Sequence, residues 1–324
     1  MEAARAINLI EEEIINDLRG KFGWHIQSVE ANNLGYGNMK WIMKTDSESY
    51  FVKKYCKVRY RRGLEDVHEA LRYQDLMYRD GIPCQPVYSY NNRYIHRLQS
   101  EEDYMITGVS KGELIQAGTA NLQQMYSLGE ATGRMHKWMS IHMPRRIALH
   151  WELPSKHKMI ARLELNLHET EEANHEKYVL AIQKQMEILS GLDMDIFNEC
   201  AKGWAHWDMH VDNLLFYKDG VADIVDFDRV QFVYPDFDIS RALLSCALKD
   251  AQMRLDAVEA YVEGYRVHMS LSNEQLVRSI KLTWYKEFKW VHAMYSSEKT
   301  MGRFIDEMIW IGDNWNELND IFKL

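Results

Sequence analysis

The pattern of apolar and polar positions changes character about a third of the way along the chain. Residues Ala3–Leu18 have apolar positions at helical spacing, and shorter runs that alternate like strands follow them. These runs are WHIQSVEANN (24–33), MKWIMKT (39–45), SYFVKKY (49–55) and PVYSYNNRYIHRL (86–98), the last a hairpin around Asn91-Asn92. Between the last two runs, residues 63–79 have a helical period that ends at Asp80-Gly81-Ile82-Pro83. The first third therefore predicts a small sheet with one inserted helix.

Long helical patterns dominate after DYMITGV (103–109). They cover Asn121–Met139, then roughly 156–192, and four further segments from Pro235 to the end. Strand-like runs in this later part are 213–217 and 221–226, joined by the Lys218-Asp219-Gly220 turn. The pattern predicts an α+β fold with two parts, a sheet lobe over residues 1–108 and a larger helical lobe over residues 109–324.

Composition bounds the class of protein. The chain has 324 residues, 46% of them hydrophobic, which is enough to bury a sizeable core. No apolar run approaches the roughly 20 residues that a membrane span needs, and the N-terminal segment is acidic and amphipathic, unlike a secretion signal. We therefore expect a compact cytoplasmic protein without a membrane partner. The sequence does not indicate an oligomeric state.

The charge is unevenly placed along the chain. The formal net charge is −9, with 15 Lys and Arg against 16 Asp and Glu in residues 1–108 and 24 against 32 in the remainder. Nucleic acid is not an expected partner, because phosphate backbones require clustered positive charge. An acidic later part suits a cationic small molecule better.

The stretch GWAHWDMHVDNLLFYKDGVADIVDFDRV (203–230) contains most of the candidate chemistry. A metal cage would use His206, Asp208 and His210, but no further His or Cys stands at the spacing of a closed zinc site. An acidic surface loop would not need apolar flanks such as NLLF and ADIVDF. Phosphoryl transfer explains the spacing, since it needs a carboxylate beside the acceptor hydroxyl and oxygen ligands for Mg²⁺. Asp208, Asn213 and Asp226 supply these groups in the order of a kinase catalytic loop and metal-binding turn.

A kinase interpretation also predicts residues in the sheet lobe. Gly35 and Gly37 form a Gly-x-Gly turn between the first two strands, where the phosphates of a nucleotide would lie. Lys53 on the third strand is the expected phosphate anchor, with Lys54 as the alternative. Glu69 on the following helix is the expected partner of that lysine, with Glu65 as the alternative.

Four segments resemble the aminoglycoside phosphotransferase and choline kinase-like family over nearly the whole chain. HWDMHVDNLLF resembles the family's H-G-D-x-H-x-x-N segment, and ADIVDFDR its I-I-D-(F/W)-(D/E) strand end. LGEATGRMHKW is similar to the helix that precedes the substrate region, and PDFDISRALL to a D-(L/I)-A helix start. The resemblance implies a bilobal protein-kinase-like fold with an antiparallel sheet lobe, and ATP-dependent phosphate transfer, with GTP as the alternative donor.

The resemblance also implies roles for individual residues. Asp208 would be the catalytic base, Asn213 and Asp226 the Mg²⁺ ligands, and Lys53 the phosphate anchor. The hinge YMITGV would bind adenine, and His206 and Asp238 would support the catalytic loop, Asp238 through hydrogen bonds to backbone N–H groups. The remaining nucleotide-site residues that the resemblance implies are Gly35, Gly37, Glu69, Met105, Thr107 and Val109.

Trp207 departs from the family pattern, because glycine generally stands between the histidine and the aspartate. A side chain at this position implies either a backbone conformation that tolerates it or a tryptophan turned into the substrate cleft. The acids and aromatics of the later part are consistent with an amine-bearing hydroxyl acceptor such as an aminoglycoside. The alternatives are a metabolite kinase of the homoserine, choline or macrolide type, and a catalytically silent kinase-fold protein such as a spore-coat relative.

Overall fold

The structure is a computed structural model that describes residues 2–32, 38–61, 63–295 and 299–324. The chain divides into two compact units, the first formed by Met1–Glu113 with Ala222–Arg229 and the second by Leu114–Val221 with Val230–Leu324. The sequence places one boundary after residue 108, whereas the segment Ala222–Arg229 belongs to the first unit. No helix in the described ranges is long and apolar enough to cross a membrane.

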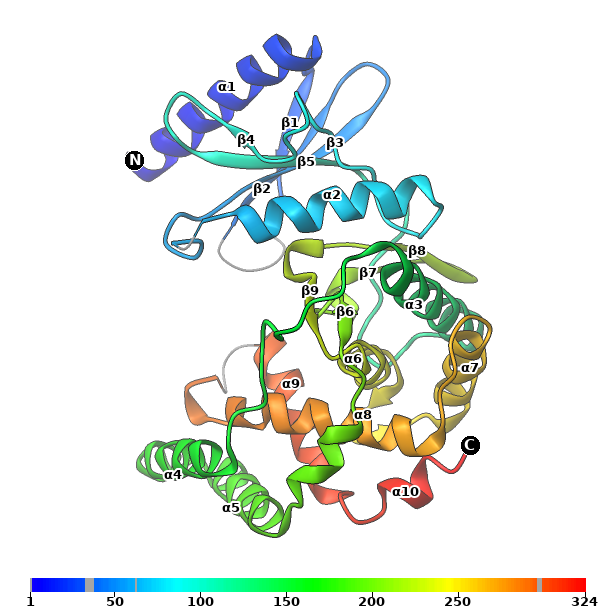
Figure 1. Cartoon of the computed structure of the whole chain (residues 1–324). Helices are drawn as coiled ribbons and strands as arrows, with labels where there is room; N and C mark the ends of the chain where they lie inside the picture. The colour runs from blue at the N-terminus through cyan, green and yellow to red at the C-terminus, as the bar shows by residue number, and fades with distance from the viewer. Residues whose placement is uncertain (1, 33–37, 62, 296–298) are drawn as a thin grey trace. The chain divides into compact units, whose positions relative to one another are not determined.

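An antiparallel sheet forms the framework of the first unit, as predicted (Figure 1). Its strands are β1 (Ser28–Ala31), β2 (Met39–Lys44), β3 (Ser49–Lys54), β4 (His96–Arg97) and β5 (Asp103–Gly108), in the order β1-β2-β3-β5-β4. β3 lies between β2 and β5, so that Lys53 is opposite Lys40 on one side and Met105 on the other. Lys53 therefore stands in the middle of the sheet.

The sheet is buried on both faces because its side chains alternate. One face packs Val52 and Ile106 against Ile14 and Leu18 of α1 (Glu2–Phe22). The other face packs Met105 and Tyr55 against residues of α2 (Glu65–Arg79), the inserted helix that the sequence predicts. The hairpin expected around Asn91-Asn92 is reduced to a turn. Both residues are in the left-handed region at φ 50° and 61°, an isolated bridge joins Tyr90 and Arg93, and β4 pairs with β5 instead.

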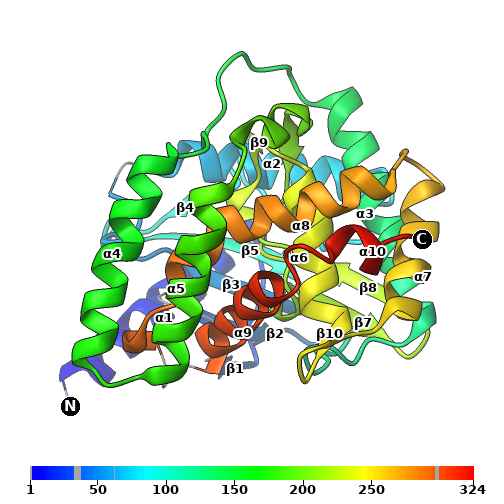
Figure 2. The same cartoon turned by 90° about the horizontal axis from the view of Figure 1, so that it is seen from below.

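Helices make up most of the second unit. They are α3 (Leu122–His142), α4 (Lys156–Glu172), α5 (Glu176–Gly191), α6 (Asp236–Ala247), α7 (Leu255–Arg266), α8 (Asn273–Glu287), α9 (Lys299–Asp313) and α10 (Leu318–Ile321) (Figure 2). Every residue of α6 is buried, so this helix forms the centre of the unit. α3 and α7 pack so closely that a Cβ atom on Gly129 would lie 1.9 Å from the carbonyl oxygen of Tyr261.

Two details of the second unit correct the sequence prediction. The helical pattern over residues 156–192 is not one helix, because the chain turns at Asn174, whose φ is 54°, and α4 and α5 lie side by side (Figure 2). Short strands also occur that were not predicted, β6 (Gly203–Ala205) with β9 (Gln231–Val233) and β10 (Leu248–Lys249) with β11 (Gln252–Met253). Two or three residues are too few to produce a visible alternation.

The strand pair predicted after residue 213 is present. β7 (Leu214–Tyr217) and β8 (Gly220–Ile224) form a two-stranded sheet. Single 3-10 turns precede and follow this pair, η2 (Val211–Asn213) before β7 and η3 (Phe227–Arg229) after β8. The residues with candidate chemistry therefore lie in short irregular segments at strand ends.

Candidate active site

Lys53 is the centre of a charge cluster in the first unit. Its Nζ lies 2.8 Å from Oδ1 of Asp226 and 2.8 Å from Oδ2 of Asp228. The lysine side chain is 2% exposed and that of Asp228 6%, whereas that of Asp226 is 39% exposed. Asp226 is thus the member of the cluster that a ligand from solvent can reach.

Asp228 is held by two tyrosines as well as by the lysine. The hydroxyls of Tyr55 and Tyr60 each donate to it over 3.1 Å. Burial and the charge of Asp228 raise the pKa of Tyr60 to about 12, so its hydroxyl remains a donor at neutral pH. Burial alone would lower the pKa of Lys53, but the charges of Asp226 and Asp228 outweigh it and raise that pKa above its usual value. From the sequence we assign Asp228 no separate role, although this residue matches the last acid of the I-I-D-(F/W)-(D/E) strand end.

The sheet and α2 place the other residues predicted for the nucleotide. Met105 and Thr107 lie on β5 and are buried, and Val109 follows the end of that strand. Glu69 lies on α2, whereas the contacts reported above for Lys53 are with Asp226 and Asp228. The nucleotide roles of these four residues stay predictions. Gly35 and Gly37 lie outside the described residues.

A buried hydrogen-bond group joins β8 to the segment after β5, and the sequence did not predict it. Asp223 accepts hydrogen bonds from Nε2 of Gln85, at 2.8 Å, and from Oγ of Ser110. Burial raises the pKa of the Asp223 carboxyl, and these two hydrogen bonds partly oppose that shift. The group ties the hinge-side segment to the strand that ends just before Asp226.

The predicted catalytic loop of the second unit is held by hydrogen bonds to side chains of the buried helix α6. Asp238 accepts hydrogen bonds from the backbone N–H groups of His206, at 2.7 Å, and Trp207, at 2.8 Å. Its carboxylate also lies 3.1 Å from Nε2 of His136 on α3. Ser245, likewise on α6, accepts from the N–H of Val211 over 2.8 Å. These bonds fix the backbone on both sides of Asp208.

Asn213 closes the loop onto Asp208. Its Nδ2 donates to the carbonyl oxygen of Asp208 at 2.9 Å and to the carboxylate at 3.2 Å. The backbone repeats this closure, because the N–H of Asn213 donates to the carbonyl of His210 over 2.8 Å. The five-residue spacing seen in the sequence thus brings these two predicted residues together.

His210 lies between two carboxylates. It is the second histidine of the H-G-D-x-H-x-x-N-like segment, and the only role considered for it from the sequence was that of a ligand in a metal cage. Its Nε2 is 3.7 Å from Asp208 and its Nδ1 is 3.2 Å from Asp212. Burial lowers the pKa of His210, but its interactions with the two carboxylates outweigh burial and raise the pKa to about 9. The imidazole is therefore cationic at neutral pH and compensates the charge beside Asp208.

Trp207 adopts the conformation that its position in the motif suggests. Its φ is 66°, in the left-handed region where a Cβ atom is strained. Its side chain is buried, with ring centres 4.5 Å from Phe237 and 5.6 Å from Trp151. Nζ of Lys286 lies 4.7 Å from the centre of the indole. The tryptophan thus accepts the glycine-type backbone and packs against aromatic rings and one cation.

Comparisons with known proteins place the chain in a family. Residues 28–271 match the model of the phosphotransferase enzyme family. The chain belongs to this family and is a phosphotransferase. The family resemblance that the sequence indicated is thereby confirmed. A sequence search among curated proteins found no match.

Solved structures of other phosphotransferases have the same fold. Amicoumacin kinase hAmiN in complex with AMP-PNP, Ca²⁺ and Ami is 14% identical, with a TM-score of 0.58 over 99% of this chain and 96% of its own. Spectinomycin phosphotransferase APH(9)-Ia with ADP and spectinomycin is 12% identical, with a TM-score of 0.60 over 96% and 97%. Choline kinase LicA from Streptococcus pneumoniae is 14% identical, with a TM-score of 0.57 over 94% and 98%. At these identities the likeness establishes the fold, and the predicted kinase-like fold class is confirmed.

The side chains expected to hold Mg²⁺ fit that ion chemically. Mg²⁺ prefers carboxylate and amide oxygens. Asn213 directs its Nδ2 to Asp208, which leaves its Oδ1 as the atom for a cation. Asp226 offers a partly exposed carboxylate whose present partner, Lys53, also contacts Asp228. Asn213 and Asp226 thus each offer an oxygen atom of the kind that Mg²⁺ prefers, and their roles as its ligands stay predictions.

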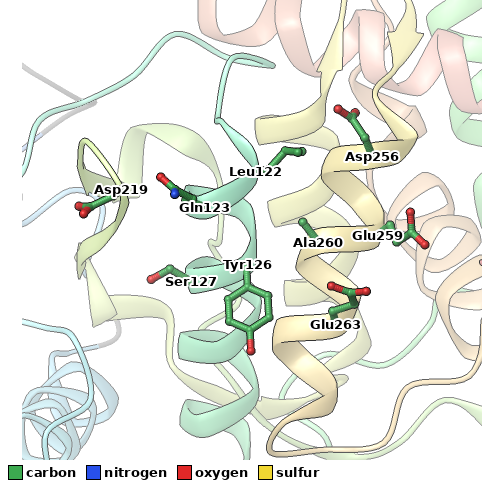
Figure 3. Close-up of a pocket in the computed structure, with 9 residues that line it drawn as sticks. All are labelled: Leu122, Gln123, Tyr126, Ser127, Asp219, Asp256, Glu259, Ala260 and Glu263. Carbon is green, nitrogen blue, oxygen red and sulfur yellow. The ribbon is translucent and has the colours of Figure 1, made fainter.

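A cavity of about 600 Å³ lies elsewhere in the second unit, along α3, α7 and the turn before β8 (Figure 3). It is lined by Leu122, Gln123, Tyr126, Ser127, Asp219, Asp256, Glu259, Ala260 and Glu263. Four of these nine side chains are carboxylic acids, and none is a lysine or arginine. Such a lining would repel a triphosphate, and it contains none of the predicted site residues. The predicted site residues that the structure describes lie instead at the loop around Asp208 and, separately, in the first unit around Lys53 and β5.

Proposed function

We propose that this phosphotransferase moves the γ-phosphate of ATP, with Mg²⁺, to a hydroxyl group of an amine-bearing small molecule such as an aminoglycoside. The observation that carries the proposal is the hydrogen-bonded pair of Asp208 and Asn213 on a loop fixed by Asp238. A carboxylate on a rigid loop is what an acceptor hydroxyl needs for deprotonation during transfer.

The chemical step assigns one task to each residue. The acceptor oxygen attacks the γ-phosphorus while its proton passes to the carboxylate of Asp208, and the bond to the β–γ bridging oxygen breaks to release ADP. Lys53 would bind the phosphates, and Asn213 and Asp226 would hold Mg²⁺, which would neutralise phosphate charge. Burial and two carboxylates keep Lys53 extended in one position before nucleotide arrives. GTP is the alternative donor.

The charge of the second part of the chain supports an amine-bearing acceptor. Residues 109–324 have 32 Asp and Glu against 24 Lys and Arg, so a cationic molecule is attracted to it. The indole of Trp207 is buried against Phe237 and Trp151, with Lys286 over its ring, so it offers little aromatic surface to that cation. Recognition of an amine would therefore use carboxylates, and the place of Trp207 at the acceptor pocket stays a prediction.

Two measurements, made one after the other, test the proposal. Thermal unfolding with ATP, GTP or ADP, each with and without Mg²⁺, should show stabilisation that depends on the metal for the triphosphates. ADP release is then measured with a panel containing an aminoglycoside, spectinomycin, choline, homoserine and a macrolide, with an amine-free polyol as the control. We expect turnover with at least one amine-bearing member and none with the polyol. Absence of stabilisation by every nucleotide would contradict the proposal.

A catalytically silent protein is the second candidate, and Trp207 is the observation that favours it. A tryptophan at φ 66° has a strained backbone, and such strain beside the predicted base would be expected in an enzyme only if it served the reaction. The release of ADP in the presence of the acceptor panel distinguishes the two candidates. A silent protein would bind MgATP without releasing ADP in the presence of any acceptor of the panel, whereas an enzyme with a narrow acceptor pocket would respond to one or a few of them.

A further inference from the structure

Arg303 connects α9 to the catalytic loop although 91 residues separate it from its partner. Its Nη2 donates to Oδ2 of Asp212 at 2.7 Å and its Nη1 to Oδ1 at 3.3 Å. Both carboxylate oxygens are thus bound by one guanidinium, the two-point geometry that fixes orientation as well as distance. Asp212 is the residue directly before Asn213.

Contacts continue from Asp212 to the predicted base. Oδ2 of Asp212, which Arg303 holds, is 3.2 Å from Nδ1 of His210. The opposite ring nitrogen of His210 is 3.7 Å from the Asp208 carboxylate and 3.3 Å from Nδ2 of Asn213. A two-point ion pair and two close contacts of the His210 ring thus form a row that leads from Arg303 to Asp208.

Arg303 lies on a helix that is anchored to its neighbours by buried ion pairs. Glu307, one turn further along α9, pairs with the buried Arg241 of α6, which also bonds Glu287 of α8 at 2.8 Å. The guanidinium of Arg241 lies 4.8 Å from the ring centre of Phe304, and the rings of Phe304 and His210 meet nearly at right angles with their centres 5.5 Å apart. α9 therefore contacts His210 directly through Phe304 and indirectly through Arg303.

The anchors from α6 and the anchor from α9 act on different parts of the loop. Asp238 and Ser245 accept hydrogen bonds from backbone N–H groups and so fix the path of the chain. The row from Arg303 ends on the carboxylate of Asp208 and on the amide of Asn213, which are the groups assigned to chemistry. A fixed backbone leaves the side-chain torsions of an aspartate free, and the row restricts them.

We propose that Arg303 is a positioning residue that, through Asp212 and His210, orients the carboxylate of Asp208 and the amide of Asn213. This inference rests on the roles that the proposed function gives to Asp208 and Asn213. Without Arg303, Asp212 can turn to solvent and His210 loses the partner that holds its Nδ1 side. Asp208 would then sample several rotamers, and only a fraction of molecules would present it correctly.

The test compares Arg303→Ala, Arg303→Lys and Asp212→Asn with Lys177→Ala as the matched control. Lys177 pairs with Asp306 of the same helix α9 at 2.8 Å, and both side chains are more than half exposed. Amide hydrogen exchange, read on peptides covering residues 206–213, reports loop order without needing an acceptor. Arg303→Ala should speed exchange in this peptide about fivefold, the scale of a partly exposed ion pair, and Lys177→Ala should leave it unchanged.

Kinetics with an acceptor from the panel supply the second readout. Arg303→Ala should lower kcat about tenfold and leave the KM for ATP unchanged, because Lys53 and the hinge are untouched. Arg303→Lys should recover part of the loss, since it keeps the charge and loses the second hydrogen bond. Arg303→Ala combined with Asp212→Asn should be no slower than either single variant, because both act along one row.

The outcomes separate this inference from the proposed function. If wild-type protein binds no nucleotide, the proposed function fails while the exchange experiment still tests the row. Loop exchange that is the same in Arg303→Ala and wild type would overturn the inference, whether or not the enzyme is active. Faster exchange throughout the chain, including α2 in the first unit, would also overturn it, because the arginine would then serve general stability.

Discussion

The two charge clusters of the molecule are built in opposite ways. In the first unit, Lys53 is almost fully buried and meets carboxylates that follow it by 173 and 175 residues. In the second unit, the acids and histidine lie within five residues, and their distant partner Arg303 leaves Asp212 45% exposed. Breaking a buried cluster leaves an uncompensated charge, whereas an exposed pair can be replaced by water. The first cluster should thus contribute to folding and the second to the rate of reaction.

The largest expected effect comes from the second unit, with Asp208→Asn. Loss of a general base lowers rates by about 100-fold to 10,000-fold, so kcat should fall within that range. The affinity for ATP should stay the same, because a base acts in the transition state more than in binding. Steady-state kinetics and calorimetric titration with nucleotide measure the two quantities. Full activity in this variant would show that Asp208 is not the base.

A large loss of stability is expected in the first unit, from Lys53→Met. The substitution leaves Asp228 buried with two tyrosine hydroxyls and no cation, which should lower the free energy of unfolding by about 3–5 kcal/mol. Lys44→Met is the matched control, because Lys44 faces Glu30 at 3.9 Å on the exposed edge of the same sheet and should change stability by less than about 1 kcal/mol. Urea denaturation measures both. Equal stability of the two variants would contradict the contrast drawn between buried and exposed pairs.

The fold was largely predictable because its signals are local. Alternation in β3 and the period of α2 each arise from the burial of a single element, and both elements form as predicted. The break after α4 was missed because it depends on one residue, Asn174, taking a left-handed conformation inside an otherwise helical pattern. Helical periodicity does not show where the backbone reverses.

The candidate site was predictable where a motif covers its residues. The spacing of Asp208 and Asn213 indicated a contact that the structure contains. Arg303 was missed, because it lies outside every motif and a contact across 91 residues leaves no pattern in either segment. Asp228 lies within the I-I-D-(F/W)-(D/E) motif, but nothing in that segment shows that Lys53 is its partner. The glycine position of the motif did carry information about the backbone, since Trp207 has the left-handed φ that glycine would adopt.

A smaller effect should separate glycine from alanine as replacements for Trp207. Both variants lose a buried indole and should be less stable than wild type by about 3–5 kcal/mol. Glycine should be the better replacement by about 1 kcal/mol, because alanine keeps the Cβ atom that is strained at φ 66°. Trp204 in β6 is the control, where a strand conformation should make alanine the better residue. The same order at both positions, measured by urea denaturation, would mean that the backbone at Trp207 carries no strain.

The smallest effects concern two histidines whose pKa values are shifted in opposite directions. Burial lowers the pKa of His96, whose Nε2 lies 2.9 Å from the carbonyl oxygen of Tyr88, whereas the pKa of His210 is raised to about 9. Below pH 6.5 the unfolded chain binds a proton at His96 more readily than the folded one, so this residue should cost stability as the pH falls. His210 binds its proton more tightly in the folded chain, so its contribution is complete below pH 6.5 and is lost as the pH rises through about 9.

His96→Gln and His210→Gln separate these two contributions in the pH dependence of unfolding. His96→Gln should flatten the loss of stability between pH 6.5 and 5, because glutamine can still donate to the carbonyl of Tyr88 without titrating. His210→Gln should flatten the loss between pH 7 and 10 and leave the acid side as in wild type. If both variants changed the same side of the pH profile, acidic or alkaline, the assignment of one neutral and one charged histidine would be wrong. The carboxylates beside His210 would then not be holding a proton on it, and the two charge clusters would differ in burial alone.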